Sequence, residues 1–261
     1  MPPGPLLTGL TFALLLIAAT SFIVYGLALS HFYRRPAVLT TGTRVHHILA
    51  IAFALAHVFT LALTSPPSAS AAVAGLALYA SGLALFFWAQ ETVKANPPML
   101  AFADDPPSAP CVTGPYRIVR HPFYAALMLT WVAGAVAVAS VWLLAIAAGM
   151  TTLYVVAARR EEAQYLRSGY AEAYAAYRAR TGMFVPRLRV ETGRPSRPLW
   201  TEARDADEDR PVLGPLALVL AILLVLLIAA GLISRALDRI QSVQVERPPA
   251  TTGVVVPVMA G

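Results

Sequence analysis

The sequence contains a single cysteine, Cys111, a single lysine, Lys94, and few charged residues of any kind. One cysteine excludes an intrachain disulfide and a zinc site built from several thiolates. Charged residues make up 13% of the 261 residues and hydrophobic residues 57%, whereas a soluble globular domain has roughly 25% charged residues. The composition therefore indicates an integral membrane protein.

The net charge of +6 comes almost entirely from arginine. Such a bias toward arginine, together with abundant alanine, is typical of a GC-rich genome, so it predicts no nucleic-acid partner. Basic residues beside a membrane gain about 1 kcal/mol each from anionic headgroups near the surface. The expected partners are therefore the lipid bilayer and lipophilic molecules.

Six apolar stretches are long enough, some only marginally, to cross about 30 Å of hydrocarbon as helices. The predicted fold is an all-α membrane protein with about six transmembrane helices. Only residues 139–141 separate the fourth stretch from the fifth, which predicts a tight helical hairpin. The stretches run from about Leu6 to Tyr33, Val45 to Thr64, Ala71 to Ala89, Phe123 to Ala139, Val141 to Ala158 and Leu213 to Ser234.

The basic residues are distributed unevenly between the two sides that six crossings define. The segments 34–47, 92–121 and 159–210 share one side and hold 17 of the 20 basic residues. Because cytoplasmic loops carry the excess of Lys and Arg, this side is predicted to be cytoplasmic and the N-terminus to lie outside. No basic residue precedes the first apolar stretch, which predicts a signal anchor in the inner membrane rather than a cleaved signal peptide.

Five regions are expected along the chain. Residues 1–91 contain the first three helices, and residues 92–190 contain the fourth and fifth helices together with the residues that carry chemistry. Residues 191–212 read as a charged, Pro-rich linker, residues 213–234 as an extra transmembrane helix and residues 235–261 as a disordered tail.

The most informative stretch precedes the fourth helix and reads GPYRIVRHPFY over residues 114–124. Pro122 suits the first turn of a helix, which predicts Arg120 and His121 at a cytoplasmic helix N-terminus. The free N–H groups and partial positive charge of such an end favour a carboxylate or a phosphate. Arginine and tyrosine are also ordinary anchors at a membrane surface, and residue types alone do not separate the two interpretations.

The complementary charge is expected where the fifth helix leaves the bilayer, at Glu161 and Glu162. The hairpin returns to the same membrane face, which brings these carboxylates towards Arg120 and His121. Adjacent residues on a helix project about 100° apart, so only one glutamate can point into a site while the other meets solvent or an arginine. Facing anion and cation sites fit a zwitterionic amino-acid moiety, and a salt-bridged helix end is the alternative.

Other polar residues give weaker signals. Tyrosine and arginine alternate over residues 165–187, which indicates an amphipathic helix that lies along the interface or lines a cofactor. The histidines at 46, 47 and 57 lack the compact i, i+4 spacing of metal ligands, and the acidic run 205–209 reads as a solvated segment. No metal site is predicted.

Taken together, GPYRIVRHPFY, RREEAQYL and YAEAYAAYRARTGMFVPRL resemble the isoprenylcysteine carboxyl methyltransferase family and the related phospholipid N-methyltransferases, over about Trp88 to Leu188. The resemblance implies a membrane methyltransferase that uses S-adenosylmethionine and methylates a lipophilic substrate at the cytoplasmic face. The implied substrate is an isoprenylcysteine-like carboxylate or a lipid amine, which enters laterally from the bilayer, and the carboxyl type is favoured. By position, the implied cofactor contacts are Tyr116, Arg120, His121, Pro122, Tyr124, Glu161 and Glu162.

The chemistry makes few demands on catalytic residues. A sulfonium methyl is already activated, so the enzyme must mainly align it with a nucleophile and exclude water. A carboxylate acceptor needs only an arginine to hold it, for which Arg117 or Arg187 is the candidate. An amine or hydroxyl acceptor needs a base, for which a glutamate such as Glu162 is the candidate.

The sequence departs from the family at Ala126 and at Tyr170-Ala171, where members commonly have glycine and Phe-Gly. A methyl group in place of hydrogen can tighten helix packing or narrow the pocket. Two alternatives therefore stay open. One is a sterol-type reductase with a nicotinamide cofactor, whose phosphates demand more basic residues around the pocket. The other is a non-catalytic membrane scaffold of the same fold.

Overall fold

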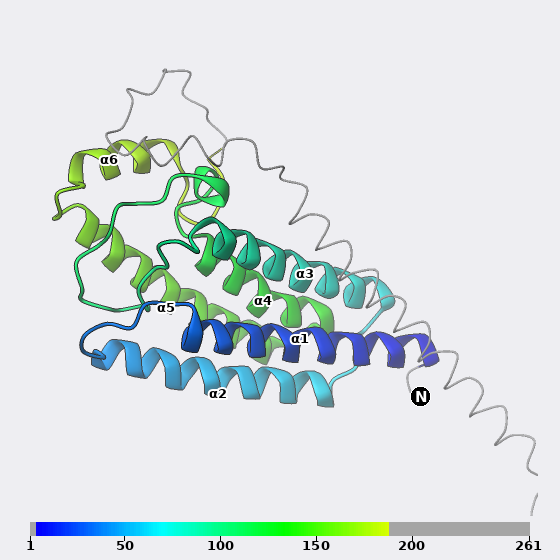
Figure 1. Ribbon diagram of the computed structural model, residues 1–261. Coiled ribbons are helices and arrows are strands. Elements are labelled where there is room, and N and C mark those ends of the chain that lie inside the picture. Colours follow the sequence, from blue (N-terminus) through cyan, green and yellow to red (C-terminus); the bar gives the residue numbers. More distant parts are fainter. Residues whose placement is uncertain (1–3, 188–261) are drawn as a thin grey trace, which may run out of the picture.

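The computed structural model describes residues 4–187, which form an all-α fold. Five long helices run antiparallel to one another in chain order, and a short sixth helix follows them (Figure 1). A single 3-10 turn, η1, precedes α4. The elements are α1 (Pro5–His31), α2 (Thr41–Leu63), α3 (Ala69–Thr92), η1 (Gly114–Arg117), α4 (Pro122–Val138), α5 (Val141–Tyr165) and α6 (Ala171–Arg180).

Four of these helices, α1, α2, α3 and α5, are long and apolar enough to cross a membrane. The protein is therefore a multi-pass membrane protein. α4 is apolar along its length but has 17 residues, fewer than the roughly 20 that a bilayer needs. The predicted sixth span, residues 213–234, lies outside the described residues, as do the predicted linker 191–212 and tail 235–261.

α4 and α5 form the tight hairpin that the sequence predicts. Ala139 ends α4 in the left-handed conformation, with a φ of 51°. The side chain of Ser140 then accepts a hydrogen bond from the backbone N–H of Leu143 and caps α5. α5 continues beyond its apolar stretch to Tyr165, because the Ala, Arg, Glu and Gln residues there are good helix formers. This extension carries Glu161 and Glu162 on regular helix.

Small residues allow α3 and α4 to approach closely. A Cβ atom at Gly75 would lie 2.4 Å from the Cβ of Ala137, and one at Gly82 would lie 2.9 Å from the carbonyl oxygen of Ala126. Small residues at helix contacts are the usual means of packing helices within a membrane. Ala126 is fully buried here, so its methyl group belongs to the packing between α3 and α4.

α2 has an exposed apolar face and a buried face that carries histidines. The exposed face consists of apolar side chains at helical spacing, as expected of a helix that faces lipid. On the inner face, His57 is fully buried, and its Nε2 lies 2.5 Å from the hydroxyl of Tyr79. His57 therefore has a structural partner within the bundle. The exposed residues are Val45, Ile48, Ile51, Leu55, Phe59 and Leu63.

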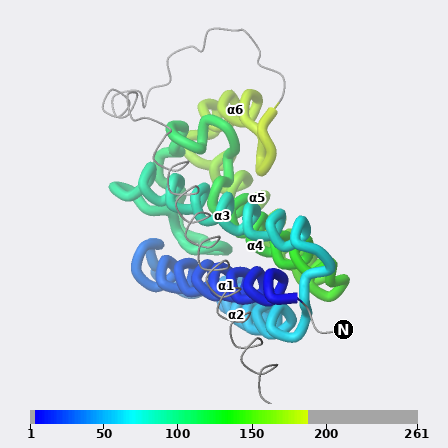
Figure 2. Tube along the Cα trace, turned by 90° about the vertical axis from the view of Figure 1, so that its right-hand side faces the viewer, coloured from blue at the N-terminus to red at the C-terminus, as the bar shows by residue number. Residues whose placement is uncertain are grey.

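One end of the bundle collects the parts of the chain that the sequence marks as chemically interesting. The C-terminal ends of α1, α3 and α5 and the N-terminal ends of α2 and α4 meet there, and η1 and α6 lie beside one another over them (Figures 1 and 2). The described parts of the three predicted cytoplasmic segments all lie at this end. The opposite end carries the start of α1 and the short connections α2–α3 and α4–α5 (Figure 1).

Candidate active site

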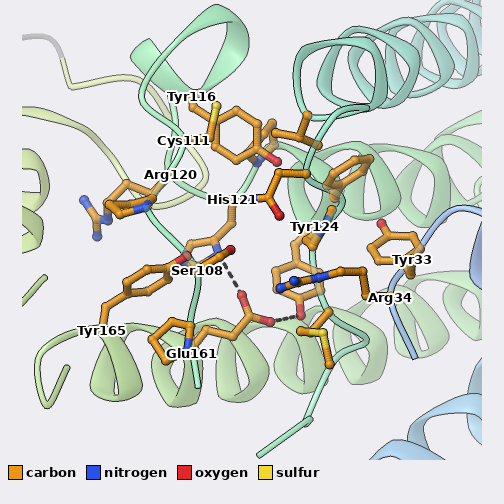
Figure 3. A pocket seen from close by; sticks show the side chains of 18 of the residues that line it. Tyr33, Arg34, Ser108, Cys111, Tyr116, Arg120, His121, Tyr124, Glu161 and Tyr165 are labelled. Atoms are coloured by element: carbon orange, nitrogen blue, oxygen red, sulfur yellow. Dashed lines mark hydrogen bonds and ion pairs between the residues drawn. The ribbon is translucent and has the colours of Figure 1, made fainter. Parts of the chain in front are cut away.

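A cavity of about 490 Å³ lies at this end of the bundle (Figure 3). Its wall is formed by the ends of α1, α3 and α5, the starts of α2 and α4, η1, α6 and the segment 95–113. Binding sites for small molecules typically have volumes of roughly 300–1,000 Å³. The cavity is therefore large enough for a cofactor or a lipid headgroup.

Glu162 is the centre of a buried cluster of charges next to this cavity. Its side chain is only 3% exposed, and its Oε1 accepts a hydrogen bond of 2.8 Å from Nε of Arg120. Nε2 of His121 lies 3.3 Å from the same oxygen, and Nε of Arg178 lies 3.4 Å from Oε2. A buried carboxylate is tolerated when cations pair with it. The cluster thereby ties α4, α5 and α6 together.

The segment after α6 holds the Arg-His block in place from the other side. The backbone N–H groups of Arg120 and His121 donate to the carbonyl oxygens of Gly182 and Met183, at 2.8 and 3.1 Å. The guanidinium of Arg120 also donates to the carbonyl of Thr181. A Cβ at Gly182 would lie 1.7 Å from the carbonyl oxygen of Val185, so this turn requires glycine. The position of Arg120 is thus fixed by side-chain and backbone contacts.

Glu161 faces the cavity, unlike its neighbour. Its carboxylate accepts a hydrogen bond from the hydroxyl of Tyr124, and its Oε2 lies 3.5 Å from Nδ1 of His121 (Figure 3). The side chain is 33% exposed and lines the cavity. The two adjacent glutamates therefore point in different directions, as their helical spacing predicts. Glu161 points into the cavity, and Glu162 pairs with an arginine.

His121 lies between the two carboxylates and is 8% exposed. Burial lowers its pKa, but the hydrogen bonds to Glu161 and Glu162 and the charges of these residues outweigh burial and raise the pKa above the ordinary value. His121 therefore keeps its positive charge to higher pH than an isolated histidine. α4 begins directly after it at Pro122 without a side-chain cap, which leaves the first backbone N–H groups of the helix available.

Tyrosines form much of the remaining wall. The rings of Tyr165 and Tyr174 stack with their centroids 4.5 Å apart, and the hydroxyl of Tyr177 donates to the carbonyl of Tyr116 at 2.7 Å. Burial raises the pKa of Tyr116 well above its ordinary value, so this side chain stays neutral. The wall therefore offers flat, uncharged ring faces beside its charged groups. The tyrosines that line the cavity are Tyr33, Tyr116, Tyr124, Tyr165, Tyr174 and Tyr177.

The structure brings most of the residues predicted for the site onto this wall. Glu162 stands outside the lining but contacts two of its members. Arg117 and Arg187 are exposed and lie outside the lining, and the guanidinium of Arg187 donates to the carbonyl of Ala179. The predicted residues that line the cavity are Tyr116, Arg120, His121, Pro122, Tyr124 and Glu161.

Several parts of the wall are not predicted by the sequence, among them Arg34, His46 and the segment 95–113. Arg34 follows an apolar stretch, where an arginine indicates only membrane orientation. The segment has no periodic pattern, although its length is a signal, since connections between helices of a bundle are usually about 2–8 residues long. It is held over α5 by Gln164, whose Nε2 donates to the carbonyl of Ala103 at 2.9 Å.

Metal ligands do not gather at this site. Within residues 4–187, no group of three or more His, Cys, Asp or Glu side chains is arranged to hold a metal ion.

Residues 70–173 match the model of a family described as phospholipid methyltransferase. The matched stretch runs from the start of α3 into the start of α6 and contains the Arg-His-Pro block and both glutamates. No curated protein and no solved structure matches the chain.

Proposed function

We propose that this protein methylates a membrane lipid at the cavity described above, because residues 70–173 match the model of the phospholipid methyltransferase family, whose members are membrane enzymes that use S-adenosylmethionine. The observation that carries this proposal is the pairing of opposite charges on the cavity wall. Glu161 presents a carboxylate, and beside it His121 and the start of α4 present positive charge.

The wall fits the amino-acid end of S-adenosylmethionine. A carboxylate such as Glu161 suits the ammonium group, and a charged histidine with uncapped helix N–H groups suits the carboxylate. The tyrosine faces suit a purine ring, because aromatic rings stack favourably. We assign the cofactor contacts to Tyr116, Arg120, His121, Pro122, Tyr124 and Glu161. Glu162 supports them, since it holds Arg120 and His121 in position.

S-adenosylmethionine, when bound, supplies an electrophilic methyl group on sulfur. The residues of the chain then have to orient the reactants and exclude water. The cluster around Glu162 and the backbone pairing with Gly182 and Met183 keep the wall rigid. The segment 95–113 covers the cavity on one side, where Arg160 and Asp104 form an ion pair of 2.5 Å. These features favour a catalyst over a scaffold that binds nothing.

The acceptor that we propose is the amine of a phospholipid headgroup. The description of the family names phospholipids, and Arg34, exposed at the cavity edge, offers a guanidinium to the lipid phosphate. The carboxylate acceptor, which sequence resemblance favours, would also need an arginine, but Arg117 and Arg187 lie away from the wall. Arg34 could hold either a phosphate or a carboxylate, so the description of the family is what favours an amine acceptor.

We further propose that the cavity faces the cytoplasm of the cell and that lipid reaches it sideways from the inner leaflet. The described basic segments gather at this end of the bundle, in agreement with the positive-inside rule. On this view α4 also spans the membrane together with α5, and the N-terminus lies outside.

A nicotinamide-dependent reductase is a weaker candidate. The phosphates of such a cofactor would need several free basic groups. Among the described residues, the arginines that line the cavity are Arg34 and Arg120, and Arg120 is already paired with Glu162. The cavity therefore has less positive charge available than a dinucleotide requires.

Transfer of labelled methyl groups tests the proposed function. The full chain in detergent micelles receives labelled S-adenosylmethionine with phosphatidylethanolamine in one arm and an isoprenylated cysteine in the other. We expect label in the phospholipid. Label in the isoprenylated cysteine alone would replace the amine acceptor by a carboxylate, and no label in either arm or in a total lipid extract would contradict methyl transfer altogether.

A further inference from the structure

His46 is a buried histidine on the cavity wall whose ring has no hydrogen-bond partner. His46 is only 5% exposed, and it lines the cavity. Within the described residues, neither Nδ1 nor Nε2 makes a hydrogen bond. Buried polar groups are normally paired, because an unpaired one loses its hydrogen bonds to water without replacement. A ligand in the cavity would supply the missing partner.

The neighbours of His46 are rings that do not satisfy it. Phe102, His47 and Tyr154 lie with ring centroids 5.7–5.9 Å away. The hydroxyl of Tyr154 is engaged elsewhere, since it accepts a hydrogen bond from Trp131 at 2.9 Å. His57, also buried on α2, has Nε2 paired with Tyr79 but Nδ1 without a hydrogen-bond partner among the described residues, and it does not line the cavity. His46 thus has the position and the free nitrogens of a residue that binds a ligand.

A row of neighbouring rings connects His46 with the charged part of the wall. Tyr154 stacks on Tyr124 with centroids 5.4 Å apart, and Tyr124 stacks on His121 with centroids 5.8 Å apart. Tyr124 also donates its hydroxyl proton to Glu161. The row therefore has the charged pair at one end and the unpartnered imidazole at the other, and both ends line the same cavity.

We propose that His46 accepts the proton that the acceptor ammonium must lose before it can be methylated, an inference that rests on the proposed function. An ammonium nitrogen has no lone pair and cannot act as a nucleophile. Its proton moves to a free imidazole nitrogen of His46, and the released lone pair forms the new N–C bond. The C–S bond of the donor breaks, and its electron pair stays on sulfur.

The proton balance closes after transfer. The methylated nitrogen is again a cation, because it keeps its remaining protons, and the imidazolium of His46 returns its proton to water. The carboxylates are less suited to this task. Glu161 is assigned to the ammonium group of S-adenosylmethionine, and Glu162 lies outside the cavity lining and is paired with Arg120.

The first test is His46→Gln, because glutamine keeps a polar side chain but does not accept a proton near neutral pH. Loss of a general base lowers a rate by about 10²–10⁴-fold, so we expect transfer to phosphatidylethanolamine to fall by about a hundredfold or more. The affinity for S-adenosylmethionine should be unchanged. His47→Gln is the matched control, since His47 is the next residue on α2 but does not line the cavity.

The second test does not depend on turnover. Histidine labelled with nitrogen-15 is incorporated into the full chain, and the imidazole signals are assigned by their loss in His46→Gln and His47→Gln. Phosphatidylethanolamine without S-adenosylmethionine should shift the His46 signals, whereas phosphatidylcholine, whose nitrogen carries no proton, should leave them in place. Equal responses to the two lipids, or a response to S-adenosylmethionine alone, would overturn the assignment.

The two experiments separate the possible failures. If the unaltered protein methylates no lipid, the proposed function is wrong, and the role of His46 falls with it. If the unaltered protein methylates the amine lipid and His46→Gln is as fast as His47→Gln, only the inference about His46 is wrong. If His46→Gln also loses S-adenosylmethionine binding, its rate no longer reports on proton transfer. The proposal then stands or falls with the His46 imidazole signals of the unaltered protein, which should shift with phosphatidylethanolamine and not with phosphatidylcholine.

Discussion

Nε of Arg120 donates a hydrogen bond of 2.8 Å to Oε1 of Glu162, although the two residues are 42 positions apart in the sequence. The contact joins the start of α4 to the end of α5 and is buried on both sides. It places the Arg-His block against the extension of α5, where Glu161 enters the cavity. Arg120 lines the cavity, whereas Glu162 does not. The rigidity of the cavity wall therefore depends on a residue outside its lining.

Replacing Glu162 by Gln should mainly destabilise the protein. The change leaves Arg120 and His121 buried without their shared carboxylate, and breaking a buried ion pair costs roughly 3–5 kcal/mol. We expect a lower melting temperature in detergent, measured by loss of tryptophan fluorescence. Glu172→Gln, an exposed change on α6, is the control. An unchanged melting temperature for Glu162→Gln would contradict the buried cluster.

The raised pKa of His121 predicts how stability depends on pH. Its folded pKa lies above that of the unfolded chain because Glu161 and Glu162 outweigh burial. The stabilisation that charged His121 gives the folded state is thus fully present below about pH 6.5, the pKa of histidine in the unfolded chain. It is lost as the pH rises through the pKa of His121 in the folded state. The free energy of unfolding should therefore decrease over that range. His121→Gln should abolish this slope, and an identical pH profile for both proteins would exclude the charged state of His121.

Replacing Arg34 by Gln should weaken binding of the acceptor without affecting the cofactor. One charge-assisted hydrogen bond contributes about 1.5–3 kcal/mol. Because Arg34 is exposed, we expect a loss at the lower end of this range, which raises the KM for phosphatidylethanolamine about tenfold. The affinity for S-adenosylmethionine should stay the same. Arg35→Gln provides the control, because Arg35 is exposed and does not line the cavity. An equal effect of both changes would remove Arg34 from the lipid site.

Cys111 reports the orientation of the cavity. It lines the cavity wall, so a membrane-impermeant thiol reagent should reach it only when the cytoplasmic face is exposed, as in inverted vesicles. S-adenosylmethionine should slow the labelling. Labelling in intact spheroplasts would reverse the proposed orientation. Cys111→Ser, which removes the thiol that the reagent modifies, controls for background.

The sequence predicts the helices and the meeting of the charged blocks, because both depend on local signals. Apolar runs determine α1 to α5, Pro122 marks the start of α4, and the three-residue gap at 139–141 determines the hairpin. An antiparallel hairpin then necessarily brings Arg120 towards Glu162. The α4–α5 contact is accordingly confirmed, while the predicted linker, sixth span and tail lie outside the described residues.

The sequence does not predict which glutamate faces the cavity or that Arg34 and His46 join its wall. The rotation of α5 about its axis depends on packing against α4 and α6, which is set by contacts between distant parts of the chain. α5 also extends to Tyr165, beyond its apolar run, because helix propensity continues where hydrophobicity ends. In the sequence, His46 cannot be distinguished from other polar residues near the start of a helix. Its burial results from contacts with Tyr154 of α5 and with Phe102, which are distant in the sequence.

Calorimetric titration of the purified full chain in detergent measures whether Glu161 and the wall around His121 hold S-adenosylmethionine. We expect the unaltered protein and Glu172→Gln to bind S-adenosylmethionine equally well. Glu161→Gln should bind about 10- to 100-fold more weakly, as expected for the loss of one bond between charged groups, while losing less thermal stability than Glu162→Gln, because Glu161 is partly exposed. Equal affinity of Glu161→Gln and Glu172→Gln, or no binding by the unaltered protein, would contradict the account.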